Sequence, residues 1–135
     1  MGADRIRERA AHKSMASAGV GSPGEDVTVR RIDLNEALIR HPQSTFVMRA
    51  AGEAMTEAGI SNGDVLLVDR ALTPEHGHVV IAAVAGELVC RRLRQRHGRT
   101  KLEAASSGHG DILPSDAAPL EIWGVVTTVI KSLID

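Results

Sequence analysis

The side chains best suited to chemistry in this sequence are six histidines and one cysteine. The histidines lie mostly in segments expected to be turns or tails: His12, His41, His76, His78, His97 and His109. His76 and His78 are neighbours, but two histidines without a third ligand are a weak zinc signal. Cys90 has no second cysteine for an internal disulfide or a CxxC pair, which suits a reducing compartment. The sequence therefore predicts neither a metal nor a cofactor.

Arg91 lies next to Cys90 in the segment GELVCRRLR, residues 86–94. If this segment is a β-strand, alternation places Arg91 on the face of Val89 and Leu93, and Cys90 on the opposite face. A cation between two apolar neighbours is costly unless it is paired or partly solvated. Arg91 is therefore either an edge residue or the remnant of a site.

The run CRRLRQRHGR, residues 90–99, is locally basic within a chain of balanced charge. Sixteen Lys and Arg against seventeen Asp and Glu give a net charge of -1, so no global positive field favours nucleic acid. Strand alternation is expected to split the basic run between two faces. The aromatic residues Phe46 and Trp123 offer no platform for stacking bases. We therefore expect no direct sequence-specific DNA binding.

The composition of the chain changes near residue 27. Residues 1–26 are rich in Ala, Ser, Gly, Arg and Glu and are predicted to form a flexible arm. RIDLNEALIRHP, which follows, predicts a short helix with Asp33 or Asn35 as its N-cap and Pro42 as its stop. The rest of residues 27–135 is expected to form one β-domain.

Short runs rich in β-branched residues recur from Thr45 onward. They are TFVMRA, DVLLVD, HVVIAAV, ELVCRRL, TKLEAA and EIWGVVTTVI, and turn residues such as Ala85-Gly86 and His97-Gly98 separate them. They predict a mainly β, folded-over and mostly antiparallel sheet with one or two short helices. No apolar run reaches membrane-spanning length, so we expect a cytoplasmic protein that does not enter a membrane.

The segment RAAGEAMTEAGISNGD, residues 49–64, joins a strand end to a Gly-Glu-X-Met sequence and a Gly-Ile-x-x-Gly-Asp turn. With RRIDLNEALIRHP, GELVCRRL and EIWGVVTTVIK, it resembles the LexA/UmuD family of self-cleaving serine peptidases, and most closely its UmuD-like members. The resemblance covers roughly residues 17–131. In that family a serine nucleophile follows the Gly-Asp/Glu pair, and a lysine on a later strand is its general base.

The resemblance implies that both members of the Ser-Lys dyad are substituted. Gly52, Glu53 and Met55 keep the frame of the nucleophile, Ala54 replaces the serine, and Arg91 replaces the lysine. Alanine has no atom that attacks a carbonyl, and a guanidinium does not become neutral at any physiological pH. Cys90 is not expected to substitute, because alternation points it to the opposite face.

The resemblance also places the family's scissile bond at Ala18-Gly19, in the arm. Too few residues precede that bond for the DNA-binding domain of a LexA-like repressor, and a leader-peptidase relative would need a membrane anchor. A UmuD-like protein is implied instead: a homodimeric accessory subunit of an error-prone translesion DNA polymerase in the SOS response. Its implied partners are a UmuC-type polymerase subunit, the recombinase filament and the sliding clamp.

Two alternatives remain at the level of sequence. The chain is either such a subunit unable to cleave itself, or a self-cleaving peptidase whose nucleophile, and with it the lysine, was replaced to trap the uncut state. A third, weaker interpretation is a peptidase-derived protein with a role unrelated to polymerases. Whether the natural protein is an enzyme is thus open.

Overall fold

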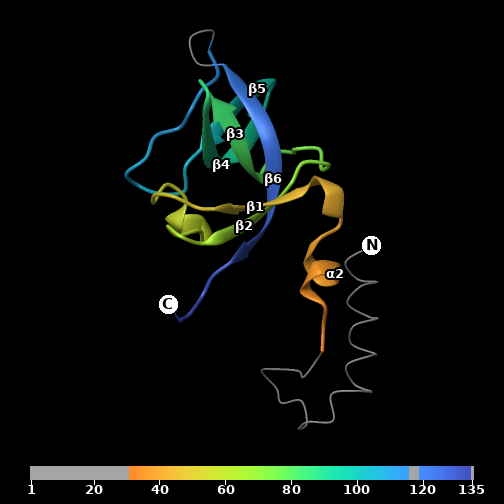
Figure 1. The fold of residues 1–135 in the computed structure, drawn as a ribbon. Coiled ribbons are helices and arrows are strands. Elements are labelled where there is room, and N and C mark those ends of the chain that lie inside the picture. Colours follow the sequence, from red (N-terminus) through yellow and green to blue (C-terminus); the bar gives the residue numbers. More distant parts are fainter. Residues whose placement is uncertain (1–30, 116–118, 135) are drawn as a thin grey trace. The chain divides into compact units, whose positions relative to one another are not determined.

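The β-domain is a six-stranded antiparallel sheet with the strand order β1-β2-β6-β3-β4-β5 (Figure 1). The computed structural model describes residues 31–115 and 119–134, and the chain divides into two units after Pro42. The strands are β1 Thr45–Arg49, β2 Val65–Asp69, β3 Val79–Val84, β4 Glu87–Arg96, β5 Arg99–Glu103 and β6 Leu120–Ile130. The prediction of a mainly β, mostly antiparallel fold is confirmed.

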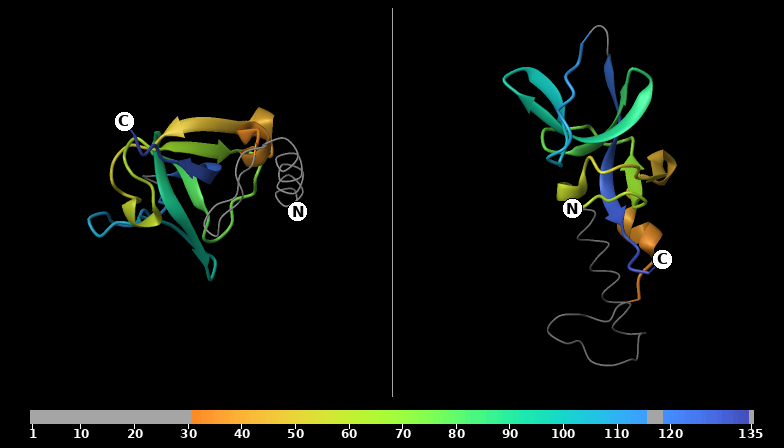
Figure 2. Two further views of the ribbon diagram at one scale, coloured as in Figure 1. Left: turned by 90° about the horizontal axis from the view of Figure 1, so that it is seen from below. Right: turned by 90° about the vertical axis from the view of Figure 1, so that its left-hand side faces the viewer.

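Strand β6 is the longest strand and joins the two halves of the sheet. Its first half pairs with β3, and its second half pairs with β2. The β2-β6 register shifts between Leu67 and Val68, and the β3-β6 register shifts between Ile81 and Ala82. Such irregularities bend a strand and increase its twist. They let the sheet fold over, so that the β4-β5 hairpin turns away from the β1-β2 layer (Figure 2).

The folded sheet encloses two groups of buried apolar residues. The first consists of Met55, Ile60, Leu66, Val68 and Ile81. The second consists of Val80, Ala82, Leu93, Leu102 and Val125. Val80 and Ile81 are consecutive, so the two faces of β3 serve different cores. The first core lies beneath the turn that carries Ala54, and the second supports the β4-β5 hairpin.

The two hairpin turns of the sheet use left-handed backbone at both central residues. Ala85 and Gly86 connect β3 to β4 with φ of 50° and 87°. His97 and Gly98 connect β4 to β5 with φ of 52° and 74°. Two successive positive φ angles are typical of a two-residue type I′ turn, whose twist matches that of the strands. Both turns were predicted from the sequence.

The N-terminal unit contains the short helix α2, Leu34–Leu38. Asp33 is the N-cap: its Oδ1 accepts a hydrogen bond from the backbone N–H of Asn35 at 2.9 Å. The expected stop at Pro42 is wrong, because the helix ends at Leu38 and Pro42 begins the 3₁₀ helix η1, Pro42–Ser44. In the part of the chain that is described, no helix is long and apolar enough to span a membrane. The predicted arm, residues 1–26, lies outside the described residues.

Candidate functional site

The turn between β1 and β2 carries Ala54 and is closed at its base by backbone hydrogen bonds. Ala50 N–H donates to the carbonyl of Asp64, and Gly63 N–H donates to the carbonyl of Ala50, both at 2.8 Å. Gly52 N–H donates to Asn62 Oδ1 at 2.8 Å. Gly52 has a φ of +84°, which an L side chain adopts only with strain. A glycine is therefore needed in this turn.

Ala54 is fixed in place by its neighbours on both sides. Met55 is only 3% exposed and anchors the turn in the first core. The 3₁₀ helix η2, Thr56–Ala58, follows directly. Ala105, which comes just after β5, donates its N–H to the carbonyl of Ala54 and accepts from Glu57 N–H, both at 2.8 Å. The position is thus as rigid as a nucleophile position requires, although it carries a methyl group.

Ala54 and Arg91 line the same cleft, which has a volume of about 550 Å³. Arg91 belongs to β4 and lies opposite Val80 of β3. Its Nη1 donates to the carbonyl of Cys90 at 2.8 Å. Its Nε is buried and has no hydrogen-bond partner among the described residues. A buried donor without an acceptor is costly, so the Arg91 side chain is held here at an energetic cost.

Cys90 lines the cleft, although it was expected to lie on the opposite face of its strand from Arg91. Strand alternation holds, because Cys90 lies opposite Ile81 and packs against the first core. Ala54 packs against that same core, and Cys90 lines the cleft. Cys90 still cannot replace the missing serine, because burial raises the pKa of its thiol to about 11 and the charge of Arg91 lowers it less. Near pH 7 only about one thiol in ten thousand is then ionised.

His109 also lines the cleft, and the sequence did not single it out as a site residue. It belongs to the SSGHGD loop, whose turn-forming composition was its only signal. Its Nδ1 lies 3.1 Å from Ser106 Oγ. His76 and His78 lie elsewhere: each has a ring nitrogen that accepts a backbone N–H, from Gln95 and Glu75 respectively. Within residues 31–115 and 119–134, no three potential ligands gather around a metal position.

The two lysines of the described residues are held outside the cleft. Lys101 pairs with Asp111 at 3.1 Å. Lys131 bonds to Asp64 and, at 3.3 Å, to Ser61 Oγ. Asp64 is 8% exposed and also accepts the N–H of Ser61 at 2.8 Å. The Lys131 bond is the largest cause that lowers the pKa of Asp64, followed by the Ser61 N–H. Lys131 therefore connects the segment after β6 to the turn that carries Ala54.

The cleft carries a methyl group at position 54 and a guanidinium at position 91. Gly52, Glu53, Ala54 and Met55 line the cleft together with Arg91. The rest of the lining is mainly apolar, with Met48, Ile60, Leu66, Ile81 and Leu88. Such a surface suits an extended peptide with small or apolar side chains. Ala18 and Gly19, predicted as the cleavage-like bond, lie outside the described residues.

Comparison with known proteins places the chain in a family. Residues 11–127 match the family described as Peptidase S24-like. The chain is 44% identical to Protein ImpA of Salmonella typhimurium over 115 residues, which cover 84% of this chain and 77% of ImpA. It is 34% identical to Protein MucA of Salmonella typhimurium over 126 residues, which cover 93% of this chain and 86% of MucA.

The LexA repressor of Syntrophotalea carbinolica is 37% identical over 86 residues, which cover 64% of this chain and 43% of that repressor. The likeness thus extends over more of the chain for the ImpA and MucA proteins than for this repressor. Together with the fold, the match to the family model over most of the sequence leads to one conclusion. The chain belongs to the Peptidase S24-like family, the LexA/UmuD family indicated by its sequence.

Proposed function

We propose that this chain is a UmuD-like accessory subunit of an error-prone translesion DNA polymerase and that it cannot cleave itself. It acts as a homodimer in the cytoplasm, in the SOS response to DNA damage. Its proposed partners are a UmuC-type polymerase subunit, the recombinase filament and the sliding clamp. The observation that carries the proposal is the cleft in which Ala54 and Arg91 meet.

Inactivity follows from the chemistry of those two positions. A Ser-Lys dyad needs a hydroxyl to attack the scissile carbonyl and a neutral amine to take its proton. Ala54 supplies no hydroxyl, and the guanidinium of Arg91 keeps its proton at all physiological pH values. The Cys90 thiol is protonated, and the hydroxyl beside His109, Ser106 Oγ, does not belong to a residue that lines the cleft. The frame that remains favours holding a peptide over cutting it.

The mainly apolar lining of the cleft supports a binding role. The Ala18-Gly19 segment of the arm is the proposed occupant, since small residues suit a narrow cleft beside Ala54. Under this proposal the arm occupies the cleft without being cut.

The second candidate is a self-cleaving peptidase whose nucleophile was replaced to trap the uncut state. The intact turn around Ala54, with its buried Met55 anchor, suits either origin. The natural coding sequence distinguishes them: a serine codon at position 54 establishes the trapped enzyme, and an alanine codon establishes the natural subunit.

The polymerase role is tested by copurification. The tagged chain, expressed in its natural host after DNA damage, should retain a UmuC-type polymerase subunit. The control is the tag alone, expressed in the same host under the same conditions, which should retain no polymerase subunit. Recovery of interacting proteins that lack any polymerase subunit would instead support the third interpretation, a role unrelated to polymerases.

A further inference from the structure

The β4-β5 hairpin collects basic side chains on one of its faces. Register places Arg94 opposite Lys101 and Arg96 opposite Arg99. Since residues two apart on a strand share a face, Arg92 belongs with Arg94 and Arg96. We call these five residues, Arg92, Arg94, Arg96, Arg99 and Lys101, the basic hairpin face. The expectation that the basic run is split between two faces is therefore wrong for all of its strand arginines except Arg91.

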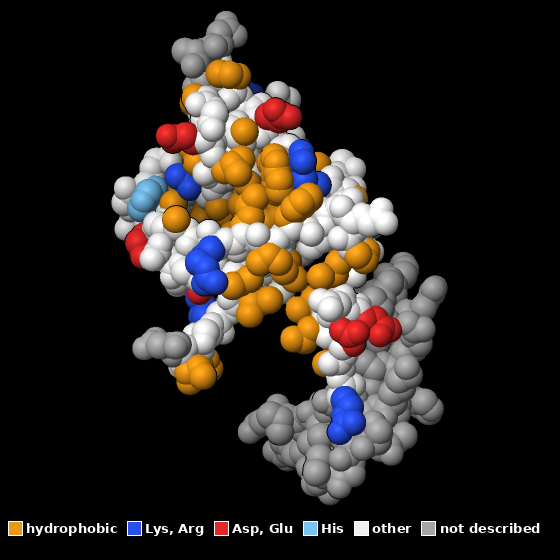
Figure 3. Space-filling model, viewed as in Figure 1, with side chains coloured by type: hydrophobic (Ala, Val, Ile, Leu, Met, Phe, Trp, Pro, Cys, Tyr) orange, Lys and Arg blue, Asp and Glu red, His pale blue; other side chains and the backbone are white. Residues whose placement is uncertain are grey.

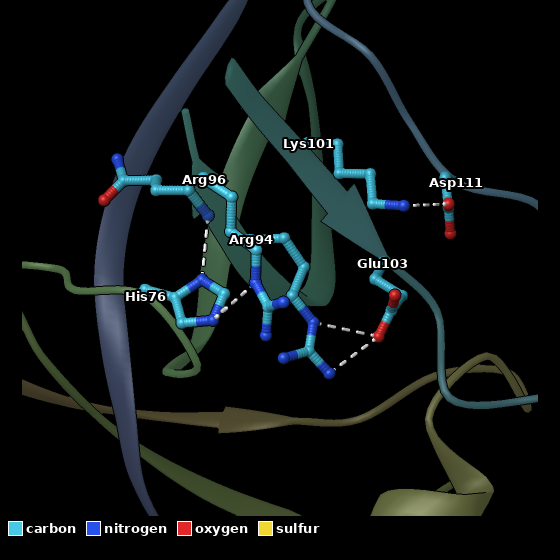
Figure 4. Close-up of polar contacts among 7 residues, drawn as sticks. His76, Arg94, Arg96, Lys101, Glu103 and Asp111 are labelled. Atoms are coloured by element: carbon cyan, nitrogen blue, oxygen red, sulfur yellow. Dashed lines mark hydrogen bonds and ion pairs between the residues drawn. The ribbon is translucent and has the colours of Figure 1, made fainter. Parts of the chain in front are cut away.

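Two of the five cations have carboxylate partners. Arg94 donates from Nε and Nη2 to Glu103 Oε1 at 3.1 and 3.0 Å. Lys101 pairs with Asp111 at 3.1 Å (Figure 4). Arg92 and Arg99 have neither an ion pair nor a side-chain hydrogen bond within residues 31–115 and 119–134. The face thus keeps an excess of positive charge.

Arg96 has only a histidine beside it. Its Nε lies 3.3 Å from His76 Nε2, and His76 Nδ1 lies 3.0 Å from the backbone N–H of Gln95. A neutral imidazole has one acceptor nitrogen, so it accepts only one of these two donors. Arg96 Nε and the Gln95 N–H therefore compete for this acceptor, and the imidazole brings no negative charge that would offset the guanidinium.

The pairing of Arg96 with Arg99 is unfavourable for the isolated protein. Like charges directly opposite each other on neighbouring strands destabilise a sheet. Beside them is a groove of about 730 Å³, whose lining includes Arg94, Arg96, Arg99, Lys101 and Thr100. Glu103 is the one carboxylate in this lining, and its charge is offset by Arg94. An anion in this groove relieves the repulsion and supplies acceptors to the unpaired guanidinium groups.

We propose that the basic hairpin face binds the phosphate backbone of nucleic acid, without reading its sequence. Four of its five cations are arginines, whose planar forks match phosphate oxygens. The hairpin beyond Leu93 is a two-stranded ribbon, because the β3-β4 register ends at Arg92. Such a ribbon can lie along a groove or a single strand. The inference stands independently of the role in polymerase function proposed above.

The composition of the groove favours a nucleic-acid backbone over an acidic peptide. Protein interfaces have an apolar core enriched in aromatic residues. The residues that line the groove include a single apolar side chain, Leu113, and no aromatic ring other than the imidazole of His97. The described aromatic residues Phe46 and Trp123 pack against each other elsewhere in the sheet, on β1 and β6. Without rings to stack on bases, contacts are limited to phosphates and are independent of sequence.

Fluorescence anisotropy with a labelled oligonucleotide tests the proposal on the full chain, with the single strand and its duplex as separate arms. With three arginines that have no carboxylate partner, the slope of log K against log salt should be about -2 for the single strand and about -3 for the duplex. Arg96→Gln with Arg99→Gln should weaken binding at low salt at least about tenfold and remove about two thirds of that slope. Arg96→Lys with Arg99→Lys should keep the slope.

Arg40→Gln with Arg70→Gln is the matched control, because it removes the same charge outside the hairpin and should leave binding nearly unchanged. Removing the Arg96-Arg99 repulsion should not lower the melting temperature, so weaker binding cannot be attributed to unfolding. Equal affinity of the Gln double variant and the unaltered chain overturns the proposal. Tighter binding to a poly-glutamate peptide of matched charge overturns it as well, in favour of an acidic protein partner.

Discussion

Ala54 and Arg91 line one cleft, although Ala54 lies in the turn after β1 and Arg91 lies on β4. The turn is fixed by Met55 in the core and by the Ala105 N–H, and β4 is held by its register with β3. Two segments far apart in the sequence are thus brought to the same cleft.

Burial of Cys90 predicts an unreactive thiol. With its pKa raised from 9.0 to about 11, its alkylation near pH 8 should be roughly a hundredfold slower than that of an unfolded control in denaturant. Mass spectrometry after timed iodoacetamide treatment measures this.

The raised pKa of Cys90 also means that the folded state holds the thiol proton more tightly than the unfolded state. Stability should therefore fall as pH rises from about 9 through 11, and Cys90→Ala should lose that part of the fall. Alkylation of the folded protein at the rate of a free thiol would contradict the claim that burial raises the pKa of Cys90.

The bond between Asp64 and Lys131 predicts that the turn carrying Ala54 is destabilised by acid. Because the pKa of Asp64 is lowered, its contribution to stability is present above about 3.8 and is lost as pH falls through its folded value. In urea unfolding across this pH range, the free energy of unfolding should fall less steeply with falling pH for Asp64→Asn than for the unaltered chain. Lys131→Met should act in the same direction. Lys101→Met, which breaks an exposed pair, is the control and should cost about 0–1 kcal/mol. If the free energy of unfolding depends on acidic pH in the same way for Asp64→Asn and the unaltered chain, the Asp64-Lys131 bond does not stabilise the turn.

Gly124 is predicted to be required where β6 crosses the sheet. A Cβ at this position comes within 2.7 Å of Val68 Cγ1 and 3.3 Å of Arg70 Cγ. Gly124→Ala should therefore lower the free energy of unfolding by about 1–3 kcal/mol through overpacking. Thermal melting followed by the fluorescence of Trp123, the single tryptophan, measures the effect. Gly108→Ala is the control, because nothing lies within 4 Å of its added methyl.

A homodimer is predicted through the β-domain. Hydrophobic side chains gather on the face of the domain in the region of β6 and β1 (Figure 3). Phe46 and Val47 of β1 and Ile130 of β6 are 44%, 69% and 42% exposed, which is costly for a monomer. Light scattering at micromolar concentration should give twice the chain mass of 14.3 kDa. Val47→Asp should shift the protein toward monomer, and Thr73→Asp, on an exposed loop, should not. A monomer mass for the unaltered chain refutes the prediction.

The sequence predicted the sheet well because each strand alternates or clusters β-branched residues between clear turn signals. It predicted the β3-β4 and β4-β5 turns because Ala-Gly and His-Gly pairs tolerate positive φ. It could not predict that Cys90 shares the core of Ala54, because alternation defines the faces of a strand but not which face the distant turn covers. The basic hairpin face was missed for a related reason: its charge arises from the register of β4 with β5, which a single strand does not reveal.

The central claim is that Ala54 and Arg91 occupy the positions of a lost Ser-Lys dyad. Ala54→Ser together with Arg91→Lys should therefore restore slow cleavage of the Ala18-Gly19 bond, and each change alone should fail, because the two groups act as a unit. The Nε of Arg91 is buried, so a lysine at this position is expected to have a pKa below about 10.4, and cleavage should speed up as pH rises toward that pKa.

Mass spectrometry of the folded double variant, at alkaline pH and with an activating recombinase filament, makes the decisive measurement. The account predicts a new chain that begins at Gly19 in the double variant, and no such chain in the unaltered protein or in either single variant. If the folded double variant stays intact under both conditions, positions 54 and 91 are not the former dyad.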